Sequence, residues 1–399
     1  MPPLSPKVPI QLPGCKSASA RALVLSAISE GAWCLRGLSE CEDTTYLKRA
    51  LRAWGASFSS SQEGLEVRGW DGVPPSTSAL LDAGEAATNL RFLLALAGLS
   101  EGPILLSGSD ALMRRPHGPL LDFLQQKGCE IRFFQKEGRK CIEVSGGPLS
   151  GGEWVGPGEL SSQFLSGLAL AAKARGDVQL ILPEERVSSG YFKMTQDMIS
   201  NFSELSQRGE RCFSIPADAS GATFFLVALC LHGGELVFER EWSDEHPEAS
   251  VGRWLVGEGL LEAEGTMWKS TGKVPERALS LNIDAFPDAG PALAILAASL
   301  PSGILFCGLG RLKIKESDRF DGMIRLAQSA GGEAVVKGED TLHITLLPSS
   351  TKLQEPFDSS GDHRLAMAAG IAGLEVQNPS CVSKSFPRFW EEFAACMRS

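Results

Sequence analysis

The chain has 399 residues, of which 43% are hydrophobic and 22% are charged, and its formal net charge is −10. This length favours two domains of ordinary size, and the 43 glycines predict many short elements joined by turns. Nucleic acids and membrane surfaces attract proteins with a net basic field. The acidic charge therefore argues against both partners and requires a local pocket for any anionic ligand.

No feature of the sequence predicts secretion or a membrane span. The N-terminus, Met-Pro-Pro-Leu-Ser-Pro, lacks a basic region followed by an apolar run. The apolar stretches near 222–231 and 291–309 are too short or are interrupted by Pro301 and Gly303. The ten cysteines show no CxxC spacing, so we expect reduced thiols in a soluble, cytoplasmic protein.

Apolar helices are predicted where a small polar residue precedes an apolar run that ends at glycine. The first runs from Ser17 or Ser19 to Gly31, and the later starts are Thr88, Ser161, Asp218, Asp288 and Asp362. From residue 17 onward these starts are 71, 73, 57, 70 and 74 residues apart. Four of these five spacings lie between 70 and 74 residues, which predicts a unit repeated about six times.

Each interval should also hold a second, amphipathic helix and a hairpin. Examples of the helix are 47–54, 120–126 and 323–330. Strand-like segments follow at 55–58, 128–131 and 332–335, with partners at 65–67, 141–144 and 342–344. Two helices and several strands in about 70 residues predict an α/β or α+β repeat.

Chance alternation of helices and strands would also explain the spacing, but it would not explain the charges. A cation next to a helix start recurs, at Lys16, Arg91, Arg115, Arg364 and Lys384. Free backbone N–H groups and the helix dipole favour anions at such positions. Six helix starts that meet at one cleft would therefore form a strong anion site.

The segment Leu12-Pro13-Gly14-Cys15-Lys16-Ser17, with Arg21 one turn later, has two interpretations. It can be a capped helix with solvated charges. Alternatively, Lys16 supplies a point charge, Ser17 a hydroxyl and Arg21 a planar fork, all suited to phosphate or carboxylate. Gly14 is expected to let the chain turn sharply into the helix.

The run from Arg311 to Arg319, Arg-Leu-Lys-Ile-Lys-Glu-Ser-Asp-Arg, predicts an anion site with an acid or base beside it at the start of an apolar helix. Glu316 is the candidate acid. The alternative for Glu316 is an ion pair with a neighbouring lysine or arginine, which would depress its pKa and oppose acid catalysis.

These segments resemble motifs of the 5-enolpyruvylshikimate-3-phosphate synthase family, in family order from residue 12 to residue 387. Residues 13–17 resemble its Pro-Gly-Ser-Lys-Ser motif, with Cys15 in place of the usual serine. The Lys-Glu-Ser-Asp-Arg run at 315–319 is the most specific match. The other matches are Arg115-Pro116, Ser161-Ser162-Gln163, Ser188 with Tyr191, Pro287-Asp288-Ala289, Asp362-His363-Arg364 and Lys384-Ser385-Phe386-Pro387.

The resemblance implies a mixed α/β (α+β) fold, a two-domain inside-out α/β barrel of six βαβαββ units, three per domain around a pseudo-threefold axis. The expected domains are a discontinuous one, 1–14 plus 217–399, and a second one, 15–216. The active site would lie in the cleft between them, and the two domains would close on the ligands.

The reaction that the resemblance implies is transfer of the enolpyruvyl group of phosphoenolpyruvate to the 5-hydroxyl of shikimate 3-phosphate, with release of phosphate. The catalytic residues would be Lys16, the base Asp288, and Glu316 for proton transfer at the methylene carbon. The family's phosphoenolpyruvate-binding positions correspond to Lys16, Ala87, Arg115, Gln163, Arg319, Arg364 and Lys384. Its shikimate 3-phosphate positions correspond to Lys16, Ser17, Arg21, Ser161, Ser162, Gln163, Ser188, Tyr191, Asp288 and Lys315.

Plainer roles stay open for two of the motif residues. Asp288 can be a helix N-cap, and His363 can be a helix-start residue. The five histidines include no pair at metal spacing, and no glycine-rich nucleotide loop is present. We therefore expect no metal and no cofactor, and the family expectation is a monomer.

The chain departs from the family pattern at Glu85-Ala86-Ala87-Thr88, where Asn-Ala-Gly-Thr is usual. The Glu85 carboxylate near an anion site is tolerable only if it pairs with a cation or turns outward. The Ala87 methyl should narrow the pocket against glyphosate, so the resemblance predicts glyphosate tolerance. Arg311 stands where some members have asparagine, and its role is open.

Two other functions compete with this interpretation. A sister enzyme that transfers enolpyruvyl to a UDP-linked amino sugar shares the six-unit fold but typically has a reactive loop cysteine. Here Cys129 and Cys141 fall in a strand-like hairpin and look structural. A non-catalytic relative that binds sugar phosphate would need neither Asp288 nor Glu316.

Overall fold

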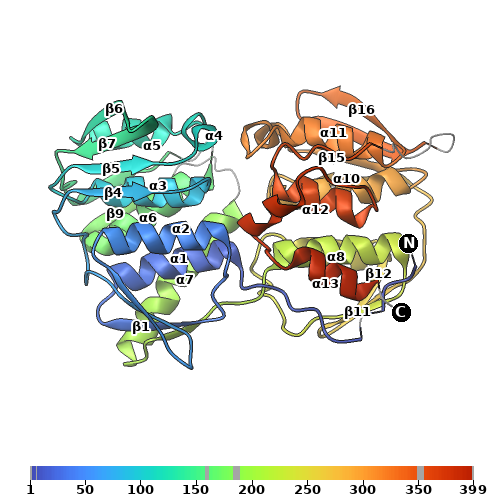
Figure 1. The fold of residues 1–399 in the computed structure, drawn as a ribbon, viewed down its shortest axis with the longest axis horizontal. Coiled ribbons are helices and arrows are strands. Elements are labelled where there is room, and N and C mark those ends of the chain that lie inside the picture. The colour runs from blue at the N-terminus through green and yellow to red at the C-terminus, as the bar shows by residue number, and fades with distance from the viewer. Residues whose placement is uncertain (1, 6, 158–160, 183–188, 348–354, 398–399) are drawn as a thin grey trace. The chain divides into compact units, whose positions relative to one another are not determined.

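The computed structural model describes residues 2–5, 7–157, 161–182, 189–347 and 355–397 (Figure 1). The chain divides into two compact units. Unit 1 joins Met1–Pro13 to Pro216–Ser399, and unit 2 is Gly14–Ile215. The chain thus begins in one unit, forms the other, and then returns to the first.

Unit 2 alternates helices and short strands. Its helices are α1 (Lys16–Ile28), α2 (Glu42–Ala53), α3 (Ala87–Ala97), α4 (Asp110–Met113), α5 (Gly118–Gln126), α6 (Ser162–Arg175) and α7 (Ser189–Gln207). Its strands are β1 (Ala32–Arg36), β2 (Ser57–Ser60), β3 (Leu65–Arg68), β4 (Ala79–Asp82), β5 (Ile104–Ser107), β6 (Glu130–Lys136), β7 (Arg139–Ser145), β8 (Gly152–Val155), β9 (Val178–Ile181) and β10 (Cys212–Ser214).

Unit 1 has the same mixed character. Its helices are α8 (Ala219–His232), α9 (Ala249–Gly257), α10 (Gly290–Ser299), α11 (Arg319–Ser329), α12 (His363–Ile371) and α13 (Phe389–Cys396), with 3-10 turns η1 (Pro287–Ala289), η2 (Gly310–Ile314) and η3 (Pro379–Lys384). Its strands are β11 (Glu235–Val237), β12 (Leu261–Glu264), β13 (Met267–Ser270), β14 (Leu279–Asn282), β15 (Ile304–Cys307), β16 (Gly332–Gly338) and β17 (Thr341–Leu346).

Within the described residues, one strand pattern recurs in three four-stranded sheets, which have the orders β10-β1-β3-β2, β4-β5-β7-β6 and β14-β15-β17-β16. In each, the first pair is parallel and the next two pairs are antiparallel. The last pair of each sheet is one of the predicted hairpins, so those predictions are confirmed. The remaining strands form the antiparallel sheet β11-β13-β12 and the parallel pair β8-β9.

The predicted apolar helices form the core of each unit. Helices α1, α3 and α6 contact one another in unit 2, and α8, α10 and α12 contact one another in unit 1 (Figure 1). Most of their side chains are buried, as their long apolar runs require. The N-cap residues are Cys15, Ala86, Ser161, Asp218, Ala289 and Asp362, so each helix starts within two residues of its predicted position.

The amphipathic helices begin earlier than their apolar periodicity indicated. Helix α2 starts at Glu42 instead of near Leu47, because Thr44 Oγ1 accepts a hydrogen bond from the N–H of Cys41 and caps an additional turn. The segment Arg311 to Asp318 precedes α11 instead of beginning it. Asp318 caps α11 by accepting from the N–H of Asp321 at 3.0 Å.

All ten cysteines are free thiols. Cys15 caps α1 in place of the usual hydroxyl, since its Sγ accepts from the N–H of Ala18 at 3.4 Å. In the described part of the chain, no helix combines the length and the apolar character that crossing a bilayer requires.

Gly14 is required for a different reason than the sharp turn that was predicted. Its φ is not among the positive values of the chain. A Cβ at this position would instead lie 1.9 Å from the carbonyl oxygen of Gly37. Close contact between two backbone segments therefore excludes a side chain here.

The substitution Gly14→Ala should destabilise the protein by about 1–3 kcal/mol, because the backbone around Gly37 must move to admit the methyl group. Urea unfolding followed by circular dichroism measures the change. Gly118→Ala is the matched control, since nothing lies within 4 Å of a Cβ placed there. Equal stability of the two variants would contradict the close-contact explanation.

Candidate active site

Arg319 is the centre of a buried ionic network in unit 1. The guanidinium is 1% exposed and donates to three carboxylates, each at 2.7 Å: Nε to Asp362, Nη1 to Asp288 and Nη2 to Glu316. Burial alone would lower the pKa of Arg319, but Asp362, Glu316 and Asp288 together raise it above its ordinary value. Arg319 is therefore a permanent cation that holds three acidic side chains at one point.

Asp288 lies between several cations and does not cap its helix. It accepts from Arg319, lies 3.3 Å from Nη2 of Arg364, and is 3.7 Å from Nζ of Lys315. It belongs to the turn η1, and Ala289 occupies the N-cap position of α10. The N-cap alternative for Asp288 is therefore wrong, because the 3-10 turn moves the helix start two residues further on.

The other two carboxylates bound to Arg319, those of Glu316 and Asp362, have different further contacts. Glu316 forms the ion pair with Arg319 that was its alternative role. Asp362 uses Oδ1 to cap α12, accepting from the N–H of Arg364 at 2.9 Å, while Oδ2 accepts from Arg319 and from Ser317 Oγ. The adjacent His363 is the first residue of α12 and is buried, which confirms its position at the helix start.

Three further predicted positions in unit 1 have distinct surroundings. Burial lowers the pKa of Lys315 to about 8, although Asp288 acts to raise it. Lys384, at the end of η3, donates to the carbonyl of Gly361 at 2.8 Å. Arg311 is held by Asp284, with Nε donating to Oδ1 at 2.9 Å and Nη2 donating to the Asp284 carbonyl. These contacts give Arg311 a structural role that the sequence left open.

Arg91 organises a second cluster, at the starts of α3 and α6 in unit 2. Its Nη1 donates to Gln163 Oε1 at 2.6 Å and to Ser161 Oγ at 3.2 Å, and its Nη2 donates to the carbonyl of Pro116. Gln163 in turn donates to Thr88 Oγ1 at 2.9 Å. Arg91 thus connects two predicted binding residues, Ser161 and Gln163, to the backbone of the Arg115-Pro116 motif, and its guanidinium lies 4.6 Å from the centre of the Phe164 ring.

Arg21 is a buried cation with neutral partners. Nε donates to Thr195 Oγ1 at 2.7 Å, Nη1 to the Ser17 carbonyl at 2.9 Å, and Nη2 to Ser166 Oγ and the Tyr191 carbonyl. Burial lowers the pKa of this guanidinium to about 10. A charge that is desolvated without a carboxylate partner among the described residues favours binding of an anion.

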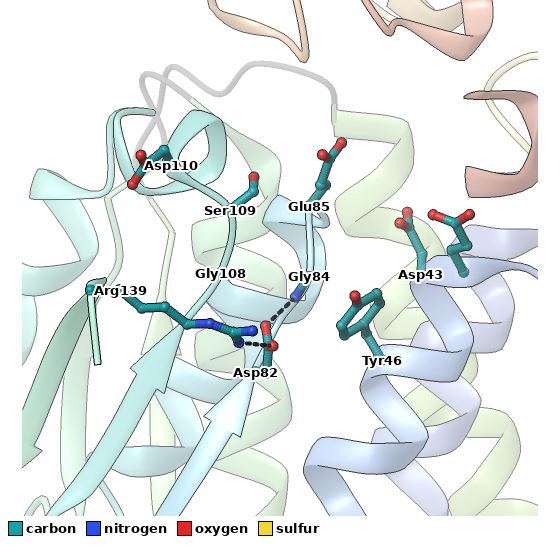
Figure 2. Close-up of a pocket in the computed structure, with 11 residues that line it drawn as sticks. Asp43, Tyr46, Asp82, Gly84, Glu85, Gly108, Ser109, Asp110 and Arg139 are labelled. Atoms are coloured by element: carbon teal, nitrogen blue, oxygen red, sulfur yellow. Dashed lines mark hydrogen bonds and ion pairs between the residues drawn. The ribbon is translucent and has the colours of Figure 1, made fainter. Parts of the chain in front are cut away.

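Lys16 pairs with Asp43 of α2 at 2.8 Å. Asp43 also lines a cavity of about 390 Å³ in unit 2, together with Asp82, Asp110, Glu85 and other residues (Figure 2). Glu85 is exposed there, which satisfies one of the two conditions for a carboxylate near an anion site. Ala87 is the first residue of α3 and is 5% exposed.

The sequence did not identify Asp43, Ser166 or Thr195 as partners of predicted site residues. Helical spacing could have identified two of them. Ser166 is four residues after Ser162 and Thr195 is four residues after Tyr191, so each lies on the same helix face as a predicted site residue. Ser188, which was predicted to bind the sugar phosphate, lies outside the described residues. Arg115 lies next to Pro116, and Ser17 and Ser162 lie in the first turns of α1 and α6.

Comparisons with known proteins identify the family. The chain matches the family model described as EPSP synthase (3-phosphoshikimate 1-carboxyvinyltransferase) over residues 3–393. It is 31% identical to the 3-phosphoshikimate 1-carboxyvinyltransferase of Nitrosomonas europaea, over 97% of this chain and 95% of that protein. It is 32% identical to the protein of the same name from Methanosphaerula palustris, over 96% and 95% of the two chains. The chain belongs to the EPSP synthase family.

Solved structures share the mixed α/β fold. The EPSP synthase of Acinetobacter baumannii matches with a TM-score of 0.75 at 23% identity, covering 99% of this chain and 97% of that one. The enolpyruvyl transferase NikO of Streptomyces tendae matches with a TM-score of 0.70 at 15% identity, covering 100% and 96%. At these identities the likeness shows the fold alone.

Lys315 should titrate near pH 8, so that it is charged and able to bind an anion at neutral pH and loses its charge above pH 8. NMR titration of ¹³C-methylated lysines measures the midpoint, and Lys315→Ala assigns the resonance. Asp288→Asn should lower the midpoint, because the Asp288 carboxylate raises this pKa. A midpoint of 10 or above would contradict the effect of burial.

Proposed function

We propose that this protein transfers the enolpyruvyl group of phosphoenolpyruvate to the 5-hydroxyl of shikimate 3-phosphate and releases phosphate. The observation that carries the proposal is the Arg319 network, which gathers Asp288, Glu316, Lys315 and Arg364 in one cluster. A base, an acid and several cations are the groups that this reaction needs. Membership of the EPSP synthase family supplies the substrates.

In the proposed mechanism, Asp288 removes the proton of the 5-hydroxyl group. The oxygen of that hydroxyl attacks the substituted carbon of phosphoenolpyruvate at the same time. Glu316 gives a proton to the methylene carbon and later removes one as phosphate leaves. Glu316 must first gain a proton, and an anionic substrate that draws the N–H donors of Arg319 away from it would permit this. Lys16 would exchange Asp43 for phosphoenolpyruvate.

The substrates would be bound by the two sets of residues predicted from the sequence. Arg21, Ser17 and Lys315 would hold shikimate 3-phosphate, and Arg115, Arg319 and Lys384 would hold phosphoenolpyruvate. Two N–H groups of Arg319, one on each Nη, remain after its three bonds to described carboxylates. Arg319 can therefore bind an anion while its bonds to Asp288 and Asp362 stay in place.

The two competing functions receive less support. Cys129 and Cys141 are buried, and burial raises the pKa of the Cys129 thiol to about 11, so neither fits the reactive loop cysteine of the sister enzyme. Fold alone does not determine the acceptor substrate, so the choice rests on the site residues and on the family. A pure binding protein would not need Asp288 and Glu316 on one arginine.

We also propose the finer architecture: an inside-out α/β barrel of six βαβαββ units, with domains 1–14 plus 217–399 and 15–216. The recurring strand order and the two groups of three mutually packed helices support it. The partners proposed are the two small-molecule substrates, and on the family expectation alone we propose a monomer. Ten free thiols favour a reducing, cytoplasmic location.

Phosphate release on mixing shikimate 3-phosphate with phosphoenolpyruvate tests the function directly. Asp288→Asn should lower kcat by a factor of about 10²–10⁴, the usual contribution of a general base, while the Kd of shikimate 3-phosphate changes little. Isothermal titration gives the Kd, and thermal melting checks that the variant is folded. Binding without any turnover by the natural protein would favour the non-catalytic binder instead.

We further propose that the Ala87 methyl confers glyphosate tolerance, because it stands at the buried first position of α3. Ala87→Gly should lower the glyphosate inhibition constant more than it lowers the KM of phosphoenolpyruvate. Steady-state inhibition assays measure both. Ala219→Gly, at the matching first position of α8, is the control. No gain in sensitivity at Ala87→Gly refutes the idea.

A further inference from the structure

The guanidinium of Arg21 is fixed on most of its edge by neutral groups. A guanidinium carries five N–H groups. Nε uses its one N–H on Thr195, Nη1 uses one of two on the Ser17 carbonyl, and Nη2 uses both, on Ser166 and the Tyr191 carbonyl. One N–H of Nη1 therefore has no acceptor among the described residues. A buried cation with one remaining donor can bind an anion only in a limited range of directions.

Thr195 makes the shortest of these bonds and is fully buried. Its hydroxyl accepts from Arg21 Nε at 2.7 Å and has one hydrogen to donate, with Ser166 Oγ at 2.8 Å and the Tyr191 carbonyl at 3.1 Å as acceptors. Thr195 lies on α7, Ser166 on α6 and Arg21 on α1. One hydroxyl therefore connects three helices at the Nε edge of the guanidinium.

We propose that Thr195 is a positioning residue for shikimate 3-phosphate, an inference that rests on the proposed function. Its hydroxyl sets the plane of the Arg21 guanidinium and so directs the remaining N–H of Nη1 toward the anionic ligand. Thr195 acts through Arg21 and does not touch the substrate. Loss of the hydroxyl leaves the Nε–H of Arg21 without an acceptor in a buried site, and the guanidinium must rotate to find another one.

Thr195→Val and Thr195→Ser separate the hydroxyl from the packing. Valine keeps the shape and removes the hydroxyl, so the KM and Kd of shikimate 3-phosphate should rise at least about tenfold, with kcat and the KM of phosphoenolpyruvate changed far less. Serine keeps the hydroxyl and should restore the affinity. Thr223→Val is the matched control, because Thr223 is a buried helix threonine whose hydroxyl donates to the Ala219 carbonyl of its own helix.

A double-substitution cycle tests whether Thr195 acts through Arg21. In an Arg21→Met background, Thr195→Val should cause no further loss of affinity for shikimate 3-phosphate. Equal affinity of Thr195→Val and the natural protein would overturn the proposal, as would a loss that serine does not restore. If the natural protein itself releases no phosphate, the proposed function fails instead, so the two failures are distinguishable.

Discussion

A single buried arginine determines the arrangement of the candidate site in unit 1. Arg319 can be taken out of water only because Asp288, Glu316 and Asp362 surround it, and they in turn are held close together only because it lies between them. Loss of one partner of a buried ion pair typically costs ~3–5 kcal/mol. The turn η1, the segment before α11 and the start of α12 are therefore fixed together by charge, in addition to packing.

The buried arginines of the two units differ in the charge of their hydrogen-bond partners. Arg319 has its charge balanced by carboxylates, whereas Arg21 has only hydroxyl and carbonyl acceptors among the described residues. A cation that is paired with carboxylates holds those acids and bases in place. A buried cation without a carboxylate partner favours binding of an anion. The first arrangement suits proton transfer and the second suits binding, which matches the roles proposed for the two groups of residues.

The positions of helices and hairpins could be predicted because their signals are local. Polar starts, apolar runs and glycine stops placed α6, α8 and α12 at their predicted starts. The site partners could not be predicted in this way, since Thr195 is 174 residues from Arg21 and Asp362 is 43 from Arg319. Local sequence was also insufficient at Asp288, because an aspartate in a 3-10 turn and an aspartate at a helix N-cap have similar sequence patterns.

The core helices combine two kinds of constraint within one short segment. Their bodies are largely buried, so size and shape limit every change there, while their first two residues include Lys16, Ala87 and Arg364, which we propose to bind the substrates. Natural variation can therefore act on substrate choice and on stability at separate positions of the same helix. Ala87 illustrates this for evolution: selection can add or remove one methyl at the first turn of α3 without repacking Leu93 or Leu94 in its body.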